Sequence, residues 1–176
     1  AILPVNKYGG TERVIWALGK ELTRMGHQVT YLLHKGSSCN FAKIIEIDYS
    51  KGIYNQIPED TDIVHFQDLT NIDEISVPYV VTINGNPPAG TQFMPNSIFV
   101  SKNHAERYGR ESFVYNGLDW DDYGVPDLSK QRKGFHFLGK AAWKVKNVNG
   151  AINITKKIRG ATLEVLGGYR LNFKMG

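Results

Sequence analysis

The chain has 176 residues, of which 41% are hydrophobic and 22% are charged, a composition typical of globular domains with a real core. The net charge of +4 favours anionic partners only weakly, and the scattered Lys and Arg residues form no basic stripe of the kind that binds nucleic acid. The longest apolar runs, such as residues 77–81, are too short to cross a bilayer. The single cysteine, Cys39, excludes an intramolecular disulfide framework and fits a reducing compartment.

The first predicted elements are a strand end and a helix. Residues 1–4 are interpreted as the tail of a strand whose beginning lies outside the sequence. An apolar stripe at helical spacing then predicts an amphipathic helix, with Val14, Leu18, Leu22 and Met25 on one side. Gly10 or Thr11 is expected to cap its start, and Gly26 to take the left-handed conformation after its end. Trp16 is expected to pack inside.

Short apolar segments follow the helix and predict strands. The predicted strands are residues 28–33, 43–47, 62–66, 78–83, 97–100 and 112–115, with a short helix at residues 101–108. Near-continuous apolar runs of this length are typical of parallel strands that helices cover on both faces. The fold class expected from this pattern is α/β, with a Rossmann-like parallel sheet.

The pattern restarts after a polar stretch rich in Gly, Pro and Asp. We predict a first domain at residues 1–115, a linker at 116–134, and a second domain at 135–176. The second domain has a strand at 135–138, a helix at 148–158 and a strand at 161–166. It is therefore interpreted as an incomplete second β-α-β unit.

Two strand-to-helix turns have the composition of anion-binding loops. Gly9 and Gly10 directly precede the first helix, where free N–H groups and the positive end of the helix dipole favour an anion. A tight turn without a ligand explains these glycines equally well, and the G-x-G-x-x-G fingerprint of dinucleotide sites is absent from this turn. In the second turn, Lys140 follows Gly139, and Lys146 comes six residues later. Two ammonium groups suit a diphosphate, but a solvated, lysine-rich loop is the alternative.

Six segments in order resemble the retaining glycosyltransferases of family 4, which have the GT-B fold. They are "YGGTERVIWALGKELTRMGHQVTYL", "DIVHFQD", "YVVTING", "SIFVSKNHAERYG", "FVYNGLDWDDY" and "FHFLGKAAWKVKN". The resemblance as a whole covers residues 4 to about 168. The resemblance implies two Rossmann-like domains, the first holding a sugar-type acceptor and the second a nucleoside-diphosphate sugar. It implies no metal and no cofactor. It also implies a role in glycan biosynthesis and a location in the cytoplasm, where peripheral contact with the inner face of the membrane is possible. It leaves the oligomeric state open.

The resemblance assigns roles to particular residues. It implies that Gly9 and Gly10 approach the donor phosphates, and that Lys140 and Lys146 hold the donor diphosphate and offset charge on the leaving group. Lys140 stands where the family usually has arginine. Thr11 and His65 are candidate acceptor contacts.

Three departures qualify the resemblance. Asn84 stands where the family has the histidine of its T-x-H motif, and asparagine cannot transfer a proton. The segment 84–96 is short, and the family's E-x7-E region would lie beyond Gly176. We therefore expect a glycosyltransferase in the full-length protein and no transfer activity in this chain alone.

The remaining polar residues receive structural interpretations. His104 and Glu106 are expected at the surface, and the carboxylates of Asp119 to Asp122 are interpreted as solvated charge rather than a metal site. Trp143 is expected to line the cleft. Two other functions stay open. The first is a non-catalytic carbohydrate-binding or assembly subunit, which Asn84 favours. The second is an unrelated Rossmann oxidoreductase, against which the missing glycine fingerprint argues.

Overall fold

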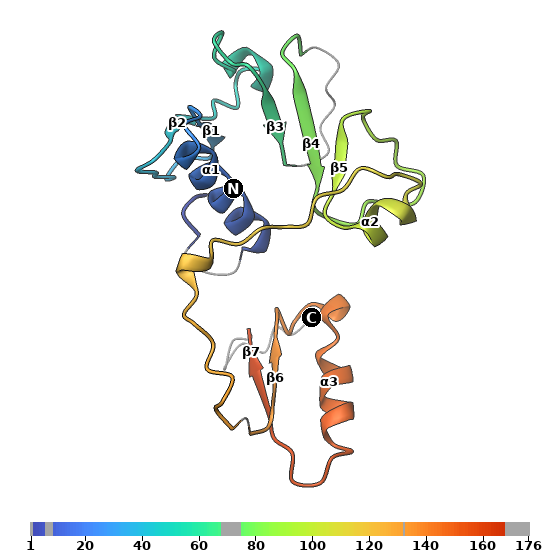
Figure 1. Cartoon of the computed structure of the whole chain (residues 1–176). Helices are drawn as coiled ribbons and strands as arrows, with labels where there is room; N and C mark the ends of the chain where they lie inside the picture. Colours follow the sequence, from blue (N-terminus) through green and yellow to red (C-terminus); the bar gives the residue numbers. More distant parts are fainter. Residues whose placement is uncertain (1, 6–8, 68–74, 132, 168–176) are drawn as a thin grey trace. The chain divides into compact units, whose positions relative to one another are not determined.

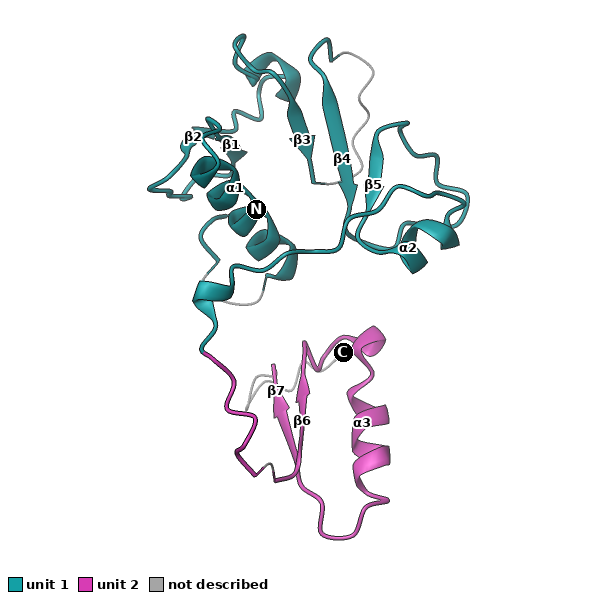
Figure 2. Ribbon diagram, viewed as in Figure 1, with its two compact units in different colours: residues 1–124 teal, residues 125–176 magenta. Residues whose placement is uncertain are grey.

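The computed structural model describes residues 2–5, 9–67, 75–131 and 133–167. It divides into two compact units, residues 1–124 and 125–176 (Figure 2). The division falls inside the segment 116–134.

The elements follow the chain as Figure 1 shows them. The first unit contains α1 (Gly10–Arg24), β1 (Thr30–Leu33), β2 (Lys43–Glu46), a 3-10 turn (Ile53–Gln56), β3 (Val64–Phe66), β4 (Tyr79–Ile83), β5 (Ser97–Phe99), α2 (Lys102–Arg107) and a 3-10 turn (Trp120–Asp122). The second unit contains β6 (Phe135–Leu138), a 3-10 turn (Lys144–Lys146), α3 (Val148–Thr155) and β7 (Leu163–Leu166). Most predicted elements are confirmed within a few residues. The strand predicted at 112–115 is reduced to one bridge between Phe99 and Phe113, and residues 2–5 form no strand.

The predicted Rossmann-like fold class is wrong. The parallel strands form three separate small sheets, with the orders β1-β2, β3-β4-β5 and β6-β7. The strands have only three to five residues each, and residues 47–63 turn away between β2 and β3 instead of continuing one sheet. In the described part of the chain, no long sheet therefore exists for helices to flank on both faces.

Close packing of α1 on β1 depends on one glycine. Gly19 is buried, and a Cβ atom there would lie 1.8 Å from the hydroxyl oxygen of Tyr31. That hydroxyl donates a hydrogen bond of 3.1 Å to the backbone oxygen of Ile15. Trp16 packs edge-to-face against Phe41, with ring centroids 4.7 Å apart, which confirms its expected packing. Without a side chain at Gly19, the helix backbone can approach the strand this closely.

The three-stranded sheet buries one face more fully than the other. Val81, Ile83 and Phe99 are buried on one side with Ala105 of α2, and they form the core of the first unit. Because successive side chains of a strand point to opposite faces, the alternate positions 65 and 82 carry a histidine and a threonine on the other side. His65 is exposed there. The expectation that helices cover both faces of these strands is therefore wrong.

The second unit has a thinner core. Its two strands pair from Phe135–Leu163 to Leu138–Leu166, and α3 packs on β6. Phe135 remains 50% exposed and Leu138 78% exposed, because two strands and one helix cannot enclose both sheet faces. Within the described residues, no helix is long and apolar enough to cross a membrane.

Candidate functional site

The turn between β6 and α3 is held in place by its backbone. The N–H of Gly139 donates to the oxygen of Leu166, and the N–H of Ala141 donates to the oxygen of Gly167. Gly167 has a φ of 117°, and a Cβ atom there would lie 2.2 Å from the oxygen of Gly139. The ends of both strands therefore approach each other closely where the lysine-containing turn begins.

Asn147 closes the same turn and starts α3. It adopts the left-handed conformation with a φ of 57°, and its side-chain oxygen accepts a hydrogen bond of 3.1 Å from the N–H of Gly150. Asparagine tolerates this conformation better than most residues and is among the preferred N-caps. Gly150 leaves room for the cap, since a Cβ atom there would lie 2.5 Å from the Asn147 amide nitrogen.

The two predicted lysines lie on this turn. The Lys140 ammonium group lies 4.6 Å from the centroid of the Trp143 ring, within the range of a cation–π contact. Lys146 is the last residue of the 3-10 turn Lys144–Lys146, and its Cγ would lie 3.9 Å from a Cβ atom at Gly139. In the described part of the chain, no ion pair joins either lysine to a carboxylate. The arrangement places two cations on one short, backbone-fixed segment.

The glycine pair before α1 has two different environments. Gly9, rather than Gly10 or Thr11, is the N-cap of α1, and a Cβ atom there would lie 2.8 Å from Cγ1 of Val5 and 3.0 Å from a carboxylate oxygen of Glu12. At Gly10, a Cβ atom would meet no atom of the described residues within 4 Å, and the φ is not left-handed. Thr11 lies in the first turn beside it. Gly9 is thus explained by packing, while the space at Gly10 is accessible, although the Glu12 carboxylate already lies near the helix start.

A polar row follows the carboxyl ends of β3 and β4. Nε2 of His65 lies 2.7 Å from the hydroxyl oxygen of Thr82. Although the His65 side chain is exposed as a whole, neighbouring atoms partly desolvate its ring. This desolvation lowers the pKa of His65, so the neutral ring is favoured.

Asn84 ends the same row just after β4. Its Nδ2 donates to the backbone oxygen of Gln67 at 3.2 Å and lies 3.3 Å from the Gln67 side-chain oxygen. These contacts use the amino group of Asn84 and leave its Oδ1 as the acceptor outside them. The row offers amide, hydroxyl and imidazole groups, which pair well with sugar hydroxyls.

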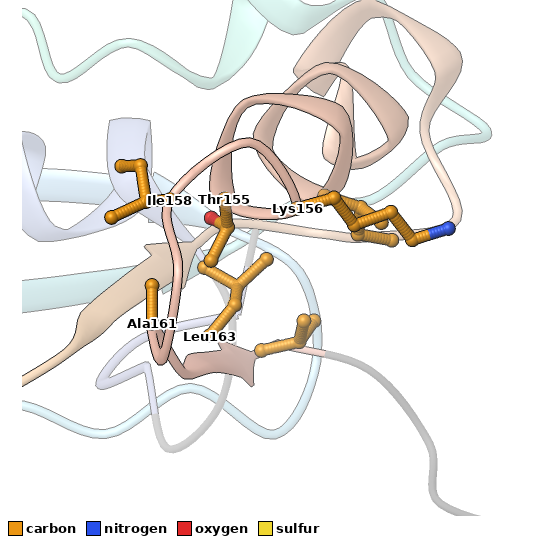
Figure 3. A pocket seen from close by; sticks show the side chains of 7 residues that line it. Thr155, Lys156, Ile158, Ala161 and Leu163 are labelled. Atoms are coloured by element: carbon orange, nitrogen blue, oxygen red, sulfur yellow. The ribbon is translucent and has the colours of Figure 1, made fainter.

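Two open grooves lie elsewhere. One, of about 450 Å³, lies between α3 and β7, and its lining side chains surround a largely apolar space while the amino group of Lys156 points away (Figure 3). The other, of about 540 Å³, lies between residues 87–93 and the end of α2. Neither groove includes Gly10, Asn84, Lys140 or Lys146 in its lining. The expectation that Trp143 lines the cleft remains a prediction.

The acidic segment 119–122 is not simply solvated charge, as the sequence suggested. Asp119 forms an ion pair with Lys20 of α1, and its Oδ1 accepts a hydrogen bond of 3.2 Å from the N–H of Asp121. The hydrogen bond from Lys20 holds the pKa of Asp119 below its usual range. Among the described residues, no group of three or more His, Cys, Asp or Glu side chains could hold a metal ion.

Sequence reasoning missed three residues near these sites. Gln67 and Thr82 were not selected, although their alternation with His65 and Asn84 on neighbouring strands was a readable signal. His104, expected at the surface, is only 4% exposed. Its neighbour Ala105 packs in the core, and a six-residue helix is too short for its apolar periodicity to reveal that.

Comparisons of the chain with models of protein families, with curated proteins and with solved structures found no match.

Proposed function

We propose that this chain belongs to a glycosyltransferase that moves a sugar from a nucleoside-diphosphate sugar to a sugar-type acceptor with retention. The bond between the anomeric carbon and the diphosphate oxygen breaks, the acceptor oxygen takes its place, and the acceptor proton leaves with the diphosphate. The protein supplies little acid–base chemistry of its own. Its main contribution is to offset negative charge on the leaving group.

The observation that carries this proposal is the pair of lysines on the turn between β6 and α3. Lys140 is oriented by the Trp143 ring, and Lys146 ends the 3-10 turn that leads to the Asn147 cap. A diphosphate on this turn would meet two ammonium groups and the positive end of α3. The order of motifs that resembles family 4 glycosyltransferases adds support, although the fold which that resemblance implied is not the one observed.

The acceptor is assigned to the first unit in this proposal. His65, Thr82 and Asn84 present hydrogen-bonding groups on one sheet face, where sugar hydroxyls could pair with them. Thr11 and the open space at Gly10 are further contacts that the proposal assigns to the ligands. The proposal also includes a cytoplasmic location, which the single Cys39 favours, with the acceptor free or at the inner membrane face.

Calorimetric titration of the chain with UDP and GDP tests the donor site. Lys140→Gln and Lys146→Gln should each weaken binding by on the order of tenfold or more, since each removes a charge-assisted contact. Lys144→Gln is the matched control, because it removes the same charge from the same 3-10 turn and should change the affinity less than about twofold. Equal losses for all three variants would indicate unspecific charge attraction and contradict the assigned site.

Asn84 supports a second candidate function, a non-catalytic carbohydrate-binding or assembly subunit. Its amino group is fixed by Gln67, and an amide cannot move a proton at the reacting centre. Transfer assays on the full-length protein with and without Asn84→His separate the two functions. Turnover that rises with histidine supports an enzyme, whereas donor binding without turnover in either form supports a binding subunit.

A further inference from the structure

His104 is a buried titratable side chain beside the core of the first unit. It is 4% exposed, and neither ring nitrogen has a partner among the described residues. Its ring packs edge-to-face against Phe99 of β5, with centroids 5.0 Å apart, and against Tyr108, with centroids 5.6 Å apart. A polar ring in such a position is tolerated when neutral and is costly when charged.

The charges around His104 add to that cost. Burial lowers the pKa of His104, and the Arg107 guanidinium on the same helix lowers it further. The backbone at Gly85 raises the pKa of His104, although its distance and angle to the ring are not those of a hydrogen bond. The nearby Glu106 carboxylate lies 3.9 Å from the ammonium group of Lys102 on the exposed side of α2. In the described region, Phe99, Tyr108, Gly85 and Arg107 therefore face the ring, and no carboxylate compensates a proton on it.

The end of α2 and the turn that follows it hold the loop after β4. Arg107 donates to the Asn86 side chain at 3.0 Å, and the Tyr108 hydroxyl donates to the backbone oxygen of Pro87 at 2.8 Å. Arg110 donates to the backbone oxygen of Phe93 at 3.1 Å. These three bonds fix residues 86–93, which begin just after Asn84 and form one wall of the 540 Å³ groove.

We propose that His104 is a pH-sensitive latch: its protonation releases α2 from β5 and loosens residues 85–93, which opens the groove beside α2. The undocked helix exposes the ring to water and takes up a proton that the docked helix excludes. Docking is therefore complete above the ordinary histidine pKa of about 6.5 and is lost as the pH falls from that value through the lower pKa of the folded state. The proposal concerns the fold of the first unit and is independent of the donor site.

Amide hydrogen exchange between about pH 7.5 and about pH 5.0, corrected for intrinsic rates, tests the latch. Protection of α2 and residues 85–93 should fall by at least about threefold at the lower pH, since each pKa unit of difference corresponds to a tenfold change in the opening constant. The His104→Leu variant should lose this pH dependence. The His27→Gln variant changes an exposed histidine and should retain it.

Two results would overturn the latch. The first is an unchanged pH dependence of α2 exchange in His104→Leu. The second is obtained on the unmodified chain by NMR titration, so it remains informative if that variant fails to fold. Titration of the His104 ring at an ordinary histidine pKa, without shifts in the α2 amides, would show that its charge does not act on docking. His65, whose pKa is also lowered, contributes equally to both proteins and cancels in the comparison.

Discussion

The sheet of β3, β4 and β5 and the β6–α3–β7 unit use the same motif of short parallel strands and one helix, but they bury it differently. In the first, Val81 and Phe99 are 1% and 0% exposed, because α2 and the loop carrying Phe93 and Met94 cover one face. In the second, Phe135 is 50% exposed. We therefore expect the coverage of a parallel sheet, rather than its strands, to decide how stable it is. The proposed diphosphate turn therefore lies on the less enclosed of the two.

Truncation of one phenylalanine in each region should sharpen this contrast most. Phe99→Ala removes a fully buried ring and should lower the free energy of unfolding of its unit by about 3–5 kcal/mol. Phe135→Ala removes a half-exposed ring and should cost on the order of 1 kcal/mol. Urea unfolding followed by circular dichroism measures both. Similar losses would mean that the second unit is as well packed as the first.

Native-state hydrogen exchange compares the same regions without mutation. Amides of β4 and β5 should be protected about a hundredfold more than those of β6 and β7, because opening the buried core exposes more apolar surface. The exchange rates of Val81 and Ile83 against those of Phe137 and Leu138 are the direct measurement. Stronger protection in β6 than in β4 would contradict the expectation that the second unit is the less enclosed one.

Two glycines of α1 provide a smaller, matched test of packing. Gly19→Ala places a methyl group against the Tyr31 hydroxyl and should destabilise the chain by about 1–3 kcal/mol before the helix-propensity gain of up to about 1 kcal/mol. Gly10→Ala meets no atom of the described residues within 4 Å and should leave the melting temperature unchanged or slightly higher. If Gly10→Ala is the more harmful change, the position of the helix start must be revised.

A pH dependence of stability is expected at Tyr31. Burial raises the pKa of Tyr31 to about 12. Between about pH 10, where an unfolded tyrosine ionises, and that value, the folded state retains a proton that the unfolded chain loses, so stability falls as the pH rises. The absorbance of tyrosinate should include a late phase from Tyr31. Tyr31→Phe should remove it, and persistence of the late phase would assign it elsewhere.

Much of the local structure was predictable because its signals lie within a few residues. The stripe of α1, the left-handed Gly26 and the strand β6 follow from periodicity and glycine conformation. The separation into small sheets was not predictable in this way. Whether β2 pairs with β3 depends on the path of residues 47–63, and no local sequence pattern encodes that path.

The candidate site was predictable only in part. The lysines and Asn84 were recognised from motifs, whereas the contact of Lys140 with the Trp143 ring and the bond from Asn84 to Gln67 depend on side-chain placement. The prediction that His104 lies at the surface was wrong. Its neighbours in sequence, Lys102, Glu106 and Arg107, are charged and suggested a surface helix, whereas the His104 ring is buried.

The most direct test of the central claim maps where a diphosphate binds. Titration of the isotope-labelled chain with UDP, followed by amide chemical shifts, compares the two glycine-containing turns in one experiment. The account predicts the largest shifts at residues 139–147, with smaller or no shifts at residues 9–13, where the Glu12 carboxylate lies close to the helix start. Shifts confined to residues 9–13, or none in either turn at millimolar UDP, would contradict the assignment of the donor site to the turn between β6 and α3.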